Sequence, residues 1–510
     1  MKNNEFSTAI INSGMITAQT FQKENREIQL SSLITLSQVP GVAVAAVGSA
    51  GRLFSHSFGT TAGGEPVTSD TLHPICSLSK AFTCALLAIA TDRGLFDWEK
   101  PLKTFIPTFE LSDPMATELL TGLDFASHRT GLAVHDPLWY AFPLSPKRAV
   151  DCLPFMQFAH PIRTAFEYNN NAYKVLARVV ELVFAKPFSE VLQEEILDPL
   201  GMVATTLDST QLPNRGMRPH EPKVNRKEGY NSMHFYSESE HDACGDTGIC
   251  TTINDYVRWL QFILNEGIIP ENNDCKRLIS TKEFSRLFIP VSIDYSYGLL
   301  EKAIEHSGPL NYALGWWIGS YRNEPYYMHS GWNDGFISLV KILPESKVAA
   351  VAFFNVDTNP FDEAIVHSVL DMGLSAVYLS KPTISPSEWA GRFEQKAKRW
   401  TNFKPPPSPK FDRLESPYDL NEYVGVYNHA LYGTLSISLK DGHLVGTRGN
   451  VHDSVLVFAG SENESIERFK MKRIRWIDTM TFKRTESHVS AVSVFFGEWN
   501  EEFNNNFIRV

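Results

Sequence analysis

The sequence predicts an α/β protein of the α+β kind, in which helices flank one antiparallel sheet, followed by a small all-β domain. Strand patterns occur at both ends of the first 380 residues, and helical patterns dominate between them, from residue 77 to about 300. This order indicates a sheet closed by the first and last segments, with a helical subdomain inserted. From Tyr423 onward apolar residues alternate with a period of two, which is typical of strands with one buried face.

The first predicted element is a helix within Ser13–Ser37, and the next is an apolar strand, Val42–Val47. Gly51 marks a turn before a second strand, Leu53–Phe58, so these two runs predict a β-hairpin. Further strand patterns precede a helix expected over Phe361–Leu379. These strands are Leu314–Ser320, Tyr326–Met328, Phe336–Leu343 and Lys347–Phe354.

Composition divides the chain into a first domain over residues 1–380, a linker over 381–412 and a β domain over 413–510. The linker is rich in proline, which removes backbone donors and fixes φ. We therefore expect a stiff linker or covering strap there rather than a helix or strand. In the β domain, turns are expected at Asp441-Gly442 and Gly460-Ser461.

Charge and hydropathy exclude several classes of function. With 47 Lys and Arg against 58 Asp and Glu, the formal net charge is −11. Nucleic acids and anionic membranes attract basic surfaces, so neither is the expected partner. The N-terminus lacks an apolar segment followed by a cleavage site, and no apolar run approaches the ~20 residues of a membrane span. We expect no membrane span and a cytoplasmic location.

Cysteine, histidine and glycine patterns give no sign of a cofactor. The six cysteines form no CxxC pair, so reduced thiols are expected. Neither HExxH nor a paired Cys/His spacing occurs, and no metal is expected. The nucleotide-binding patterns GxGxxG and GxxxxGKS/T are also absent.

The most informative segment lies at the start of Leu78–Ala90, an apolar run typical of a buried helix. Residues i and i+3 share a helix face, so Ser77 Oγ and Lys80 Nζ can meet there. Burial lowers the pKa of a lysine, and free N–H groups at a helix N-terminus stabilise an oxyanion. A nucleophile beside its base is one interpretation, and a structural pair is the other. Ser338 and Lys341 repeat the spacing, but in a strand they face opposite sides.

Two further segments carry polar groups beside predicted elements. Tyr168 and Asn170 precede an amphipathic helix, either as a loop with an N-cap or as a proton carrier and a polar anchor. His329 and Gly331 lie near a strand, where glycine permits close approach of the backbone. The N–H of Trp332 at this strand edge can supply half of an oxyanion hole. A lone histidine near a strand is also compatible with a structural role.

Ser-x-x-Lys, Tyr-x-Asn and His-x-Gly, in this order, resemble the serine β-lactamase-related family, which contains class C β-lactamases, D-Ala-D-Ala carboxypeptidases, esterases and transesterases. The likeness covers residues 30–380 approximately, and the tail from Tyr423 is similar to the lipocalin-like domain that often follows. Other segments that look like the family's are Ser127–Leu132, Pro199–Met202 with Thr205, Gly245–Gly248 with Thr252 and Asp255, Leu314–Trp316 and the strand ending in Asn355.

The resemblance implies a β-lactamase/transpeptidase-like fold with a chemical role for each motif. It makes Ser77 the acylated nucleophile, Lys80 the base that activates it, and Tyr168 the residue that passes a proton to the leaving group. No metal or cofactor is implied.

The resemblance also implies substrate-binding residues. Asn170 would hold the substrate amide or ester, and Trp332 N–H would join Ser77 N–H in the oxyanion hole next to Gly331. His329 stands where a lysine is common, and a neutral imidazole binds a carboxylate less well than an ammonium. A second departure is Asn169, where serine is usual.

These observations predict a serine hydrolase that cleaves an ester, thioester or amide through an acyl-enzyme on Ser77. An alternative is an acyltransferase or transesterase that passes the acyl group to an alcohol or amine, for example in natural-product biosynthesis. A catalytically inactive ligand-binding homologue is another. The expected partner is a small-molecule or peptide-like acyl substrate, and a homo-oligomer is compatible with the sequence. Aromatic residues, Trp332, Tyr168 and Trp139-Tyr140, suggest an apolar acyl-binding cleft.

Overall fold

The computed structural model describes most of the chain. The described residues are 24–136, 138, 144–223, 225–232, 244–269, 276–294, 310–378, 381, 383–402, 416, 418–448, 451–463, 466–472, 477–484, 489–495 and 506–510. The chain falls into two compact units, Met1–Phe96 with Val183–Lys404 and Asp97–Leu182 with Pro405–Val510. The expected domain boundaries at residues 380 and 413 stay predictions.

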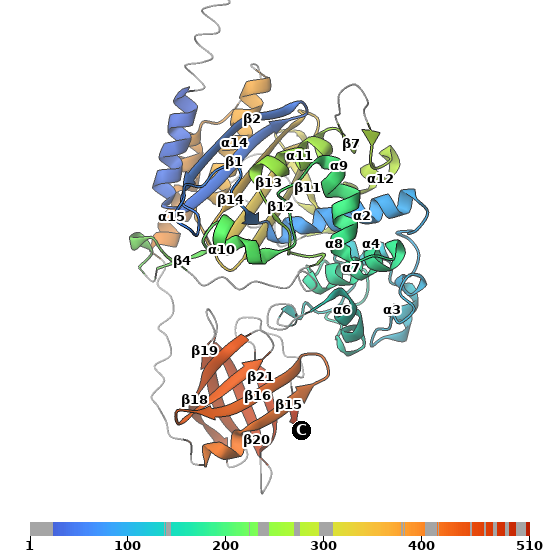
Figure 1. Ribbon diagram of the computed structural model, residues 1–510, viewed down its shortest axis with the longest axis vertical. Helices are drawn as coiled ribbons and strands as arrows, with labels where there is room; N and C mark the ends of the chain where they lie inside the picture. The colour runs from blue at the N-terminus through green and yellow to red at the C-terminus, as the bar shows by residue number, and fades with distance from the viewer. Residues whose placement is uncertain are drawn as a thin grey trace, which may run out of the picture. The chain divides into compact units, whose positions relative to one another are not determined.

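An eight-stranded antiparallel sheet forms the centre of the first unit, in the order β2-β1-β14-β13-β12-β11-β10-β9 (Figure 1). Its strands are β1 (Gly41–Gly48), β2 (Gly51–Gly59), β9 (Ser292–Ile293), β10 (Asn311–Tyr312), β11 (Trp317–Tyr321), β12 (Glu324–Asn333), β13 (Phe336–Leu343) and β14 (Val348–Phe354). Val42 in β1 stands opposite both Phe58 in β2 and Phe354 in β14. The predicted hairpin, and the closure of the sheet by its first and last segments, are confirmed.

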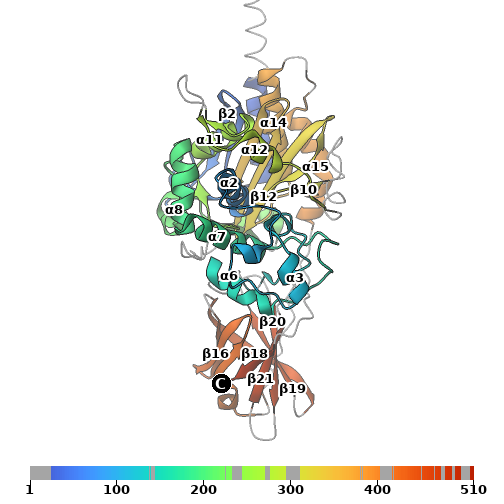
Figure 2. The same ribbon diagram turned by 90° about the vertical axis from the view of Figure 1, so that its right-hand side faces the viewer.

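Helices cover both faces of this sheet, and β1, β13 and β14 are accordingly buried along their whole length. On one face α14 (Asp362–Val377) approaches β1, because a Cβ at Gly373 would lie 3.0 Å from Ala46 Cβ. On the other face α11 (Ile253–Leu264) brings the ring of Tyr256 to 5.5 Å from that of Phe353. Figures 1 and 2 show helices on both sides of the strands.

The remaining elements of this unit are mostly short. Its other helices are α2 (Ser79–Asp92), α8 (Phe188–Leu192), α9 (Asp198–Leu200), α10 (Leu212–Arg215) and α12 (Thr281–Arg286). Its short strands are β3 (His73–Pro74), β4 (His220–Pro222), β5 (Tyr230–Ser232), β6 (Cys250–Thr251), β7 (Ile268–Ile269) and β8 (Lys276–Arg277). A helix also spans residues 24–37, as predicted for that part of Ser13–Ser37. Residues 13–23 lie outside the described chain.

The prediction that residues 381–412 contain no helix was wrong, because α15 (Pro386–Thr401) lies within them. Pro386 occupies the first turn, where a helix needs no N–H donor. Trp389 is fully buried, and its Nε1 donates to Asp371 Oδ2 in α14 at 2.8 Å. The proline content of the segment indicated a linker. A helix forms nevertheless, because Pro386 stands in its first turn and its apolar face is buried.

The second unit combines a helical region with a closed antiparallel barrel. The helices are α3 (Pro114–Leu119), α4 (Gly122–Ala126), α6 (Pro146–Cys152) and α7 (Asn170–Phe184), and the strands are β15 (Gly425–His429), β16 (Gly433–Lys440), β17 (His443–Arg448), β18 (Val451–Asn463), β19 (Ile466–Lys472), β20 (Ile477–Arg484), β21 (Val489–Phe495) and β22 (Asn506–Arg509). Asp441-Gly442 turns between β16 and β17, as predicted. The turn expected at Gly460-Ser461 was wrong, because β18 continues through it with shifts of register, and a glycine in a strand often marks such a bulge.

No helix within the described ranges is long and apolar enough to cross a membrane.

Candidate active site

The segment around Ser77 joins a 3-10 turn, η1 (Cys76–Leu78), to the buried helix α2. Ser77 is half-buried, whereas Lys80 has no exposed surface. Lys80 Nζ donates a hydrogen bond to Ser77 Oγ at 3.1 Å. The structure therefore brings these two predicted residues together, with Ser77 in the turn that leads into the α-helix.

The backbone before Ser77 adopts a conformation that residues with a Cβ rarely take. Cys76 has a φ of +50°, in the left-handed region. Its neighbour Ile75 is held in place, because the Ile75 carbonyl accepts a hydrogen bond from Ser338 Oγ at 2.6 Å. Such strain persists only where surrounding contacts fix it, and it is common at functional sites.

Three polar side chains of α2 bind consecutive carbonyl groups of the segment before β6. Lys80 Nζ donates to Asp246 O at 3.0 Å. Ser79 Oγ donates to Thr247 O at 2.5 Å, and Thr83 Oγ1 donates to the carbonyl of residue 245 at 2.7 Å. The Lys80 amine is thus fixed from two sides. Our sequence reasoning missed this contact, although polar residues in an apolar helix signal a buried partner.

β12 passes beside the Ser77 segment, and glycine is required at the crossing. A Cβ at Gly331 would lie only 2.3 Å from the carbonyl oxygen of Ile75 and 3.0 Å from Cys76 Cβ. The absence of a side chain therefore lets the strand approach the segment that carries Ser77.

The hairpin geometry of β12 directs specific N–H groups away from β13. Asn333 and Phe336 flank a two-residue loop, and such a flanking pair exchanges both of its backbone hydrogen bonds. Hydrogen-bonded and non-hydrogen-bonded pairs alternate along an antiparallel ladder. The odd-numbered residues of β12 therefore hydrogen-bond to β13. Even-numbered residues bond to β11 instead, but that ladder ends at the pair Met328–Trp317. In the described sheet, the N–H of Trp332 therefore points to a strand edge, where an oxyanion can be bound.

The side chain of Trp332 lies on the sheet face opposite to His329 and Gly331, because successive residues of a strand alternate. Its Nε1 donates to Asp357 O at 2.7 Å, and the side chain is 39% exposed. The Trp332 indole therefore points away from His329, and the apolar acyl-binding cleft expected from the aromatic residues stays a prediction. Trp139-Tyr140, the other suggested wall, lies outside the described residues.

Replacing Gly331 with alanine should slow any reaction of Ser77 by about 10-fold or more, since the strand must retreat from Ile75 and a small displacement lowers reactivity strongly. The rate of active-site labelling measures this effect. Gly391→Ala is the control, because nothing lies within 4 Å of a Cβ there. Equal rates for Gly331→Ala and the parent chain would contradict the close approach.

His329 is fully buried and its two ring nitrogens have separate partners. Tyr312 Oη lies 3.0 Å from Nε2, and the Ser330 carbonyl oxygen lies 2.7 Å from Nδ1. A neutral ring satisfies both, with Nδ1–H donating and Nε2 accepting. Burial, with the nearby charge of Lys80, lowers the pKa of His329 to about 3. His329 thus offers no positive charge at neutral pH.

Buried neutral histidines make the free energy of unfolding depend on pH. Burial lowers the pKa of His73, like that of His329, to about 3, whereas an unfolded histidine titrates near 6.5. The unfolded state therefore binds more protons below pH 6.5, and stability falls as the pH falls from there toward 3. When the pH falls from 7 to 5.5, each of these two rings should lower the free energy of unfolding by about 1 kcal/mol.

Urea unfolding at these two pH values measures the loss. In His73→Gln the loss should be smaller by about 1 kcal/mol, because the buried neutral ring is gone. The same loss in His73→Gln and the parent chain would rule out His73 as a contributor.

The Ser-x-x-Lys pattern also matches Ser338 and Lys341, and the Tyr-x-Asn pattern also matches Tyr321-Arg322-Asn323; both copies have structural roles. Ser338 donates to Ile75 O, whereas Lys341 Nζ lies 2.8 Å from Glu363 Oε2 in α14. The predicted opposite orientation of Ser338 and Lys341 is confirmed. Tyr321-Arg322-Asn323 belongs to the turn between β11 and β12, and Arg322 and Asn323 both have positive φ.

Tyr168 and Asn170 belong to the second unit, at the start of α7. The Tyr168 ring lies 4.3 Å from that of His128, and Asn170 Nδ2 donates to Asp136 Oδ1 at 3.2 Å. Asn169 caps the helix, because its Oδ1 accepts from Ala172 N at 3.2 Å. The Asn run is therefore an N-cap, as one interpretation of the sequence held, and Asn169 has a structural task.

No group of three or more His, Cys, Asp or Glu side chains suited to a metal ion occurs among the residues that the structure describes. The five cysteines within those residues are buried. Cys275 lies outside them.

Known proteins resemble this chain in sequence and in fold. Unguisins hydrolase ungD of Aspergillus violaceofuscus is 25% identical over 445 residues, which is 83% of this chain and 78% of that protein. A D-aminopeptidase of Brucella canis is 28% identical over 261 residues, 48% of this chain and 46% of its own. The octameric penicillin-binding protein homologue from Pyrococcus abyssi superposes with a TM-score of 0.59 at 14% identity, over 95% of this chain and 99% of its own.

The family model described as Beta-lactamase matches residues 30–371, which include Ser77, Lys80 and the whole His-x-Gly segment. This match covers well over half of the chain and agrees with the large antiparallel sheet. The chain belongs to the beta-lactamase family of serine hydrolases.

Proposed function

We propose that this chain cleaves an ester, thioester or amide through an acyl-enzyme formed on Ser77. One observation carries the proposal: a buried lysine amine is hydrogen-bonded to the hydroxyl of a half-exposed serine. A serine hydroxyl is a weak nucleophile unless a base takes its proton. Lys80 stands in the position of that base.

The first step transfers one proton and forms one bond. Once its amine has given up a proton, Lys80 keeps one N–H donated to Asp246 O and turns its lone pair toward the Ser77 hydroxyl, which then donates to it. As Oγ attacks the substrate carbonyl, Lys80 takes the Ser77 proton. The oxyanion is held by the N–H groups of Ser77 and Trp332, and each such donor is worth about 3–4 kcal/mol in other enzymes.

The tetrahedral intermediate then collapses: the bond from the carbonyl carbon to the leaving oxygen, sulfur or nitrogen breaks, and the acyl group stays on Ser77. Tyr168 passes a proton to the leaving group, and Asn170 holds the substrate amide or ester, in line with the family resemblance. A water molecule then attacks the acyl-enzyme, giving a carboxylic acid and free Ser77. An alcohol or amine in place of water would make the same chain an acyltransferase or transesterase.

The substrate class follows from His329 and from the relatives. The neutral, buried His329 provides no ammonium for a substrate carboxylate. One relative is named a hydrolase and the other an aminopeptidase, a name that denotes cleavage of an amide bond. A peptide-like amide or an ester without a free carboxylate next to the scissile bond is the proposed substrate.

The C-terminal barrel is proposed to be lipocalin-like. Its eight antiparallel strands pair in sequence order, and β15 closes on β22, which is the up-and-down arrangement of that class.

Short p-nitrophenyl esters should be hydrolysed faster than the β-lactam nitrocefin, with a kcat/KM at least about 10-fold higher, because the β-lactam carboxylate meets no cation at His329. Absorbance assays of both substrates at pH 7.5 measure the ratio. A preference for nitrocefin would reverse this ranking and indicate a β-lactamase.

A fluorophosphonate probe tests the acyl-enzyme directly. It should label the chain once, and peptide mapping by mass spectrometry should find the adduct on Ser77. Acyl transfer would appear as ester or amide product when an alcohol or amine is added. A chain that takes up no probe and hydrolyses no ester would be the inactive homologue.

A further inference from the structure

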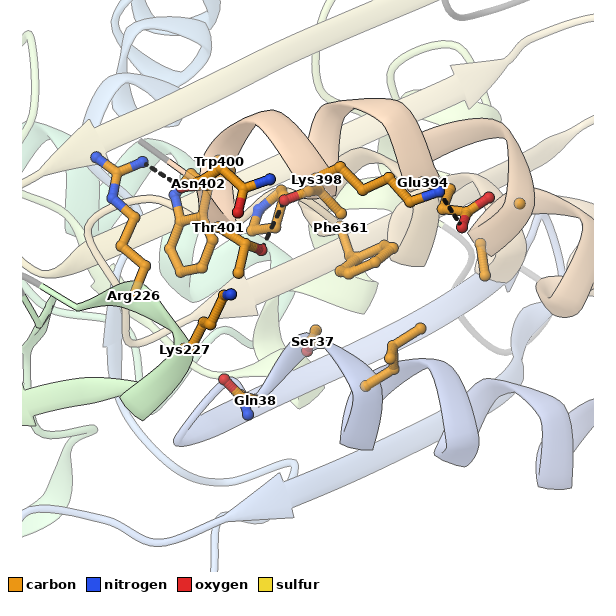
Figure 3. Close-up of a pocket in the computed structure, with 15 residues that line it drawn as sticks. Ser37, Gln38, Arg226, Lys227, Phe361, Glu394, Lys398, Trp400, Thr401 and Asn402 are labelled. Atoms are coloured by element: carbon orange, nitrogen blue, oxygen red, sulfur yellow. Dashed lines mark hydrogen bonds and ion pairs between the residues drawn. The ribbon is translucent and has the colours of Figure 1, made fainter. Parts of the chain in front are cut away.

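A cavity of about 630 Å³ lies on the side of the first unit where α14 and α15 pack. Figure 3 shows it between α15, the end of the helix over residues 24–37 and the 3-10 turn η6 (Arg226–Glu228). Its volume is within the ~300–1,000 Å³ of small-molecule sites.

The cavity is separate from the surroundings of Ser77. The helix that carries Lys80, α2, packs on α11, since the ring of Phe82 lies 4.0 Å from that of Trp259. α11 and α14 cover opposite faces of the sheet, and α15 packs outside α14 through Trp389. The sheet therefore stands between this cavity and the candidate active site.

One part of the cavity wall is apolar and partly open. Leu36 is 58% exposed, which is high for a leucine, and it lines the cavity together with Phe361 and Trp400. On α15, Ala390 and Gly391 leave space, because nothing lies within 4 Å of a Cβ at Gly391. An apolar group bound here would be shielded from water.

The other part of the wall is basic. Arg226 and Lys227 enter together from η6 at one end, whereas Glu394 lies toward the other end, as Figure 3 shows. Glu394 is paired with Lys398 at 2.7 Å, so the acidic side chain of the lining is matched by a neighbour on its own helix. The lining thus has an excess of positive charge concentrated at the η6 end.

Arg226 is held in a fixed orientation. Its guanidinium lies over the Trp400 ring, with Cζ 5.0 Å from the ring centre, and Nη1 donates to Trp400 O at 3.2 Å. A planar guanidinium presents several parallel donors, and a carboxylate accepts two of them at once. A held arginine loses less side-chain entropy on binding an anion than a free one.

We propose that this cavity is a second binding site, which takes a small amphipathic carboxylate. The carboxylate lies at Arg226 and Lys227, and the apolar body lies along Leu36, Phe361 and the small residues of α15. Charge complementarity selects the anion, and the cavity volume limits the ligand to a small molecule.

Sodium decanoate is the probe, with decan-1-ol and decylammonium as neutral and cationic analogues of the same chain length. Isothermal titration calorimetry of the full chain should show one saturable site for decanoate. Both analogues should bind at least about 10-fold more weakly, because the charged hydrogen bonds to Arg226 are lost. Equal affinity for decan-1-ol, or no decanoate binding at 1 mM, would overturn the proposal.

Variants locate the ligand. Arg226→Gln should weaken decanoate binding at least about 10-fold by removing the guanidinium, and Gly391→Leu should do the same by filling the cavity. Arg392→Gln is the matched control, because Arg392 also stacks on a tryptophan of α15 but does not line the cavity. A cooperative thermal unfolding transition shows whether each variant is folded. If Gly391→Leu does not fold, Arg226→Gln alone tests where decanoate binds. Unchanged affinity in Arg226→Gln would place decanoate elsewhere, including at the candidate active site.

Discussion

Ser77→Ala is expected to abolish fluorophosphonate labelling and to lower substrate turnover by at least about 10⁴-fold, because the residue that would form the acyl-enzyme is gone. The fold should be unaffected, since Ser77 is only half-buried and loses a single hydroxyl. Labelling is read by mass spectrometry, and turnover by release of p-nitrophenol.

The choice of control matters, because serines near the site have structural contacts. Ser79 binds the carbonyl of Thr247, and Ser338 binds that of Ile75, so removing either hydroxyl disturbs the surroundings of Ser77. Ser387, exposed on α15, is the cleaner control and should keep full labelling. Labelling that persists in Ser77→Ala would show that the nucleophile is another residue.

Lys80→Ala is expected to slow acylation by at least about 10²-fold, which is the usual scale for the loss of a general base. Ser77 then keeps its hydroxyl but has no group to take its proton. The rate of labelling under single-turnover conditions measures the effect, separately from product release.

Lys341 provides a matched comparison, because it is equally buried and has the same spacing from a serine. Its partner is Glu363 in α14, at 2.8 Å. Lys341→Ala leaves that carboxylate without its cation and should cost about 3–5 kcal/mol of stability, while the folded fraction still acylates at the parent rate. Lys80→Ala, in contrast, should fold normally but acylate at least about 10²-fold more slowly than the parent chain. Full acylation in Lys80→Ala would exclude Lys80 as the base.

Elements built from neighbouring residues could be predicted from the sequence. The β1–β2 hairpin and the buried helix α2 follow from local periodicity and turn residues. The meeting of Lys80 with Ser77 also follows locally, because they are three positions apart, which is about one helical turn. The N-cap at Asn169 is of the same kind.

Position within an element mattered more than composition in two places. Residues 381–412 contain α15 because Pro386 stands in the first turn, where proline is tolerated. Gly460 lies inside β18 because a glycine can form a bulge as readily as a turn. Overall proline or glycine content could not distinguish these cases.

The sequence by itself determined the order of the motifs, the spacing of Ser77 and Lys80, and the strands that make up the sheet. Tertiary structure alone decided which distant groups surround them. Asp246 O meets the Lys80 amine across 166 residues, and Ser338 reaches the Ile75 carbonyl across 263. The end of β11 at Trp317 determines that Trp332 N–H lies at a strand edge. Local periodicity reflects only the burial of each side chain, whereas these contacts depend on how whole elements pack, which no short-range pattern encodes.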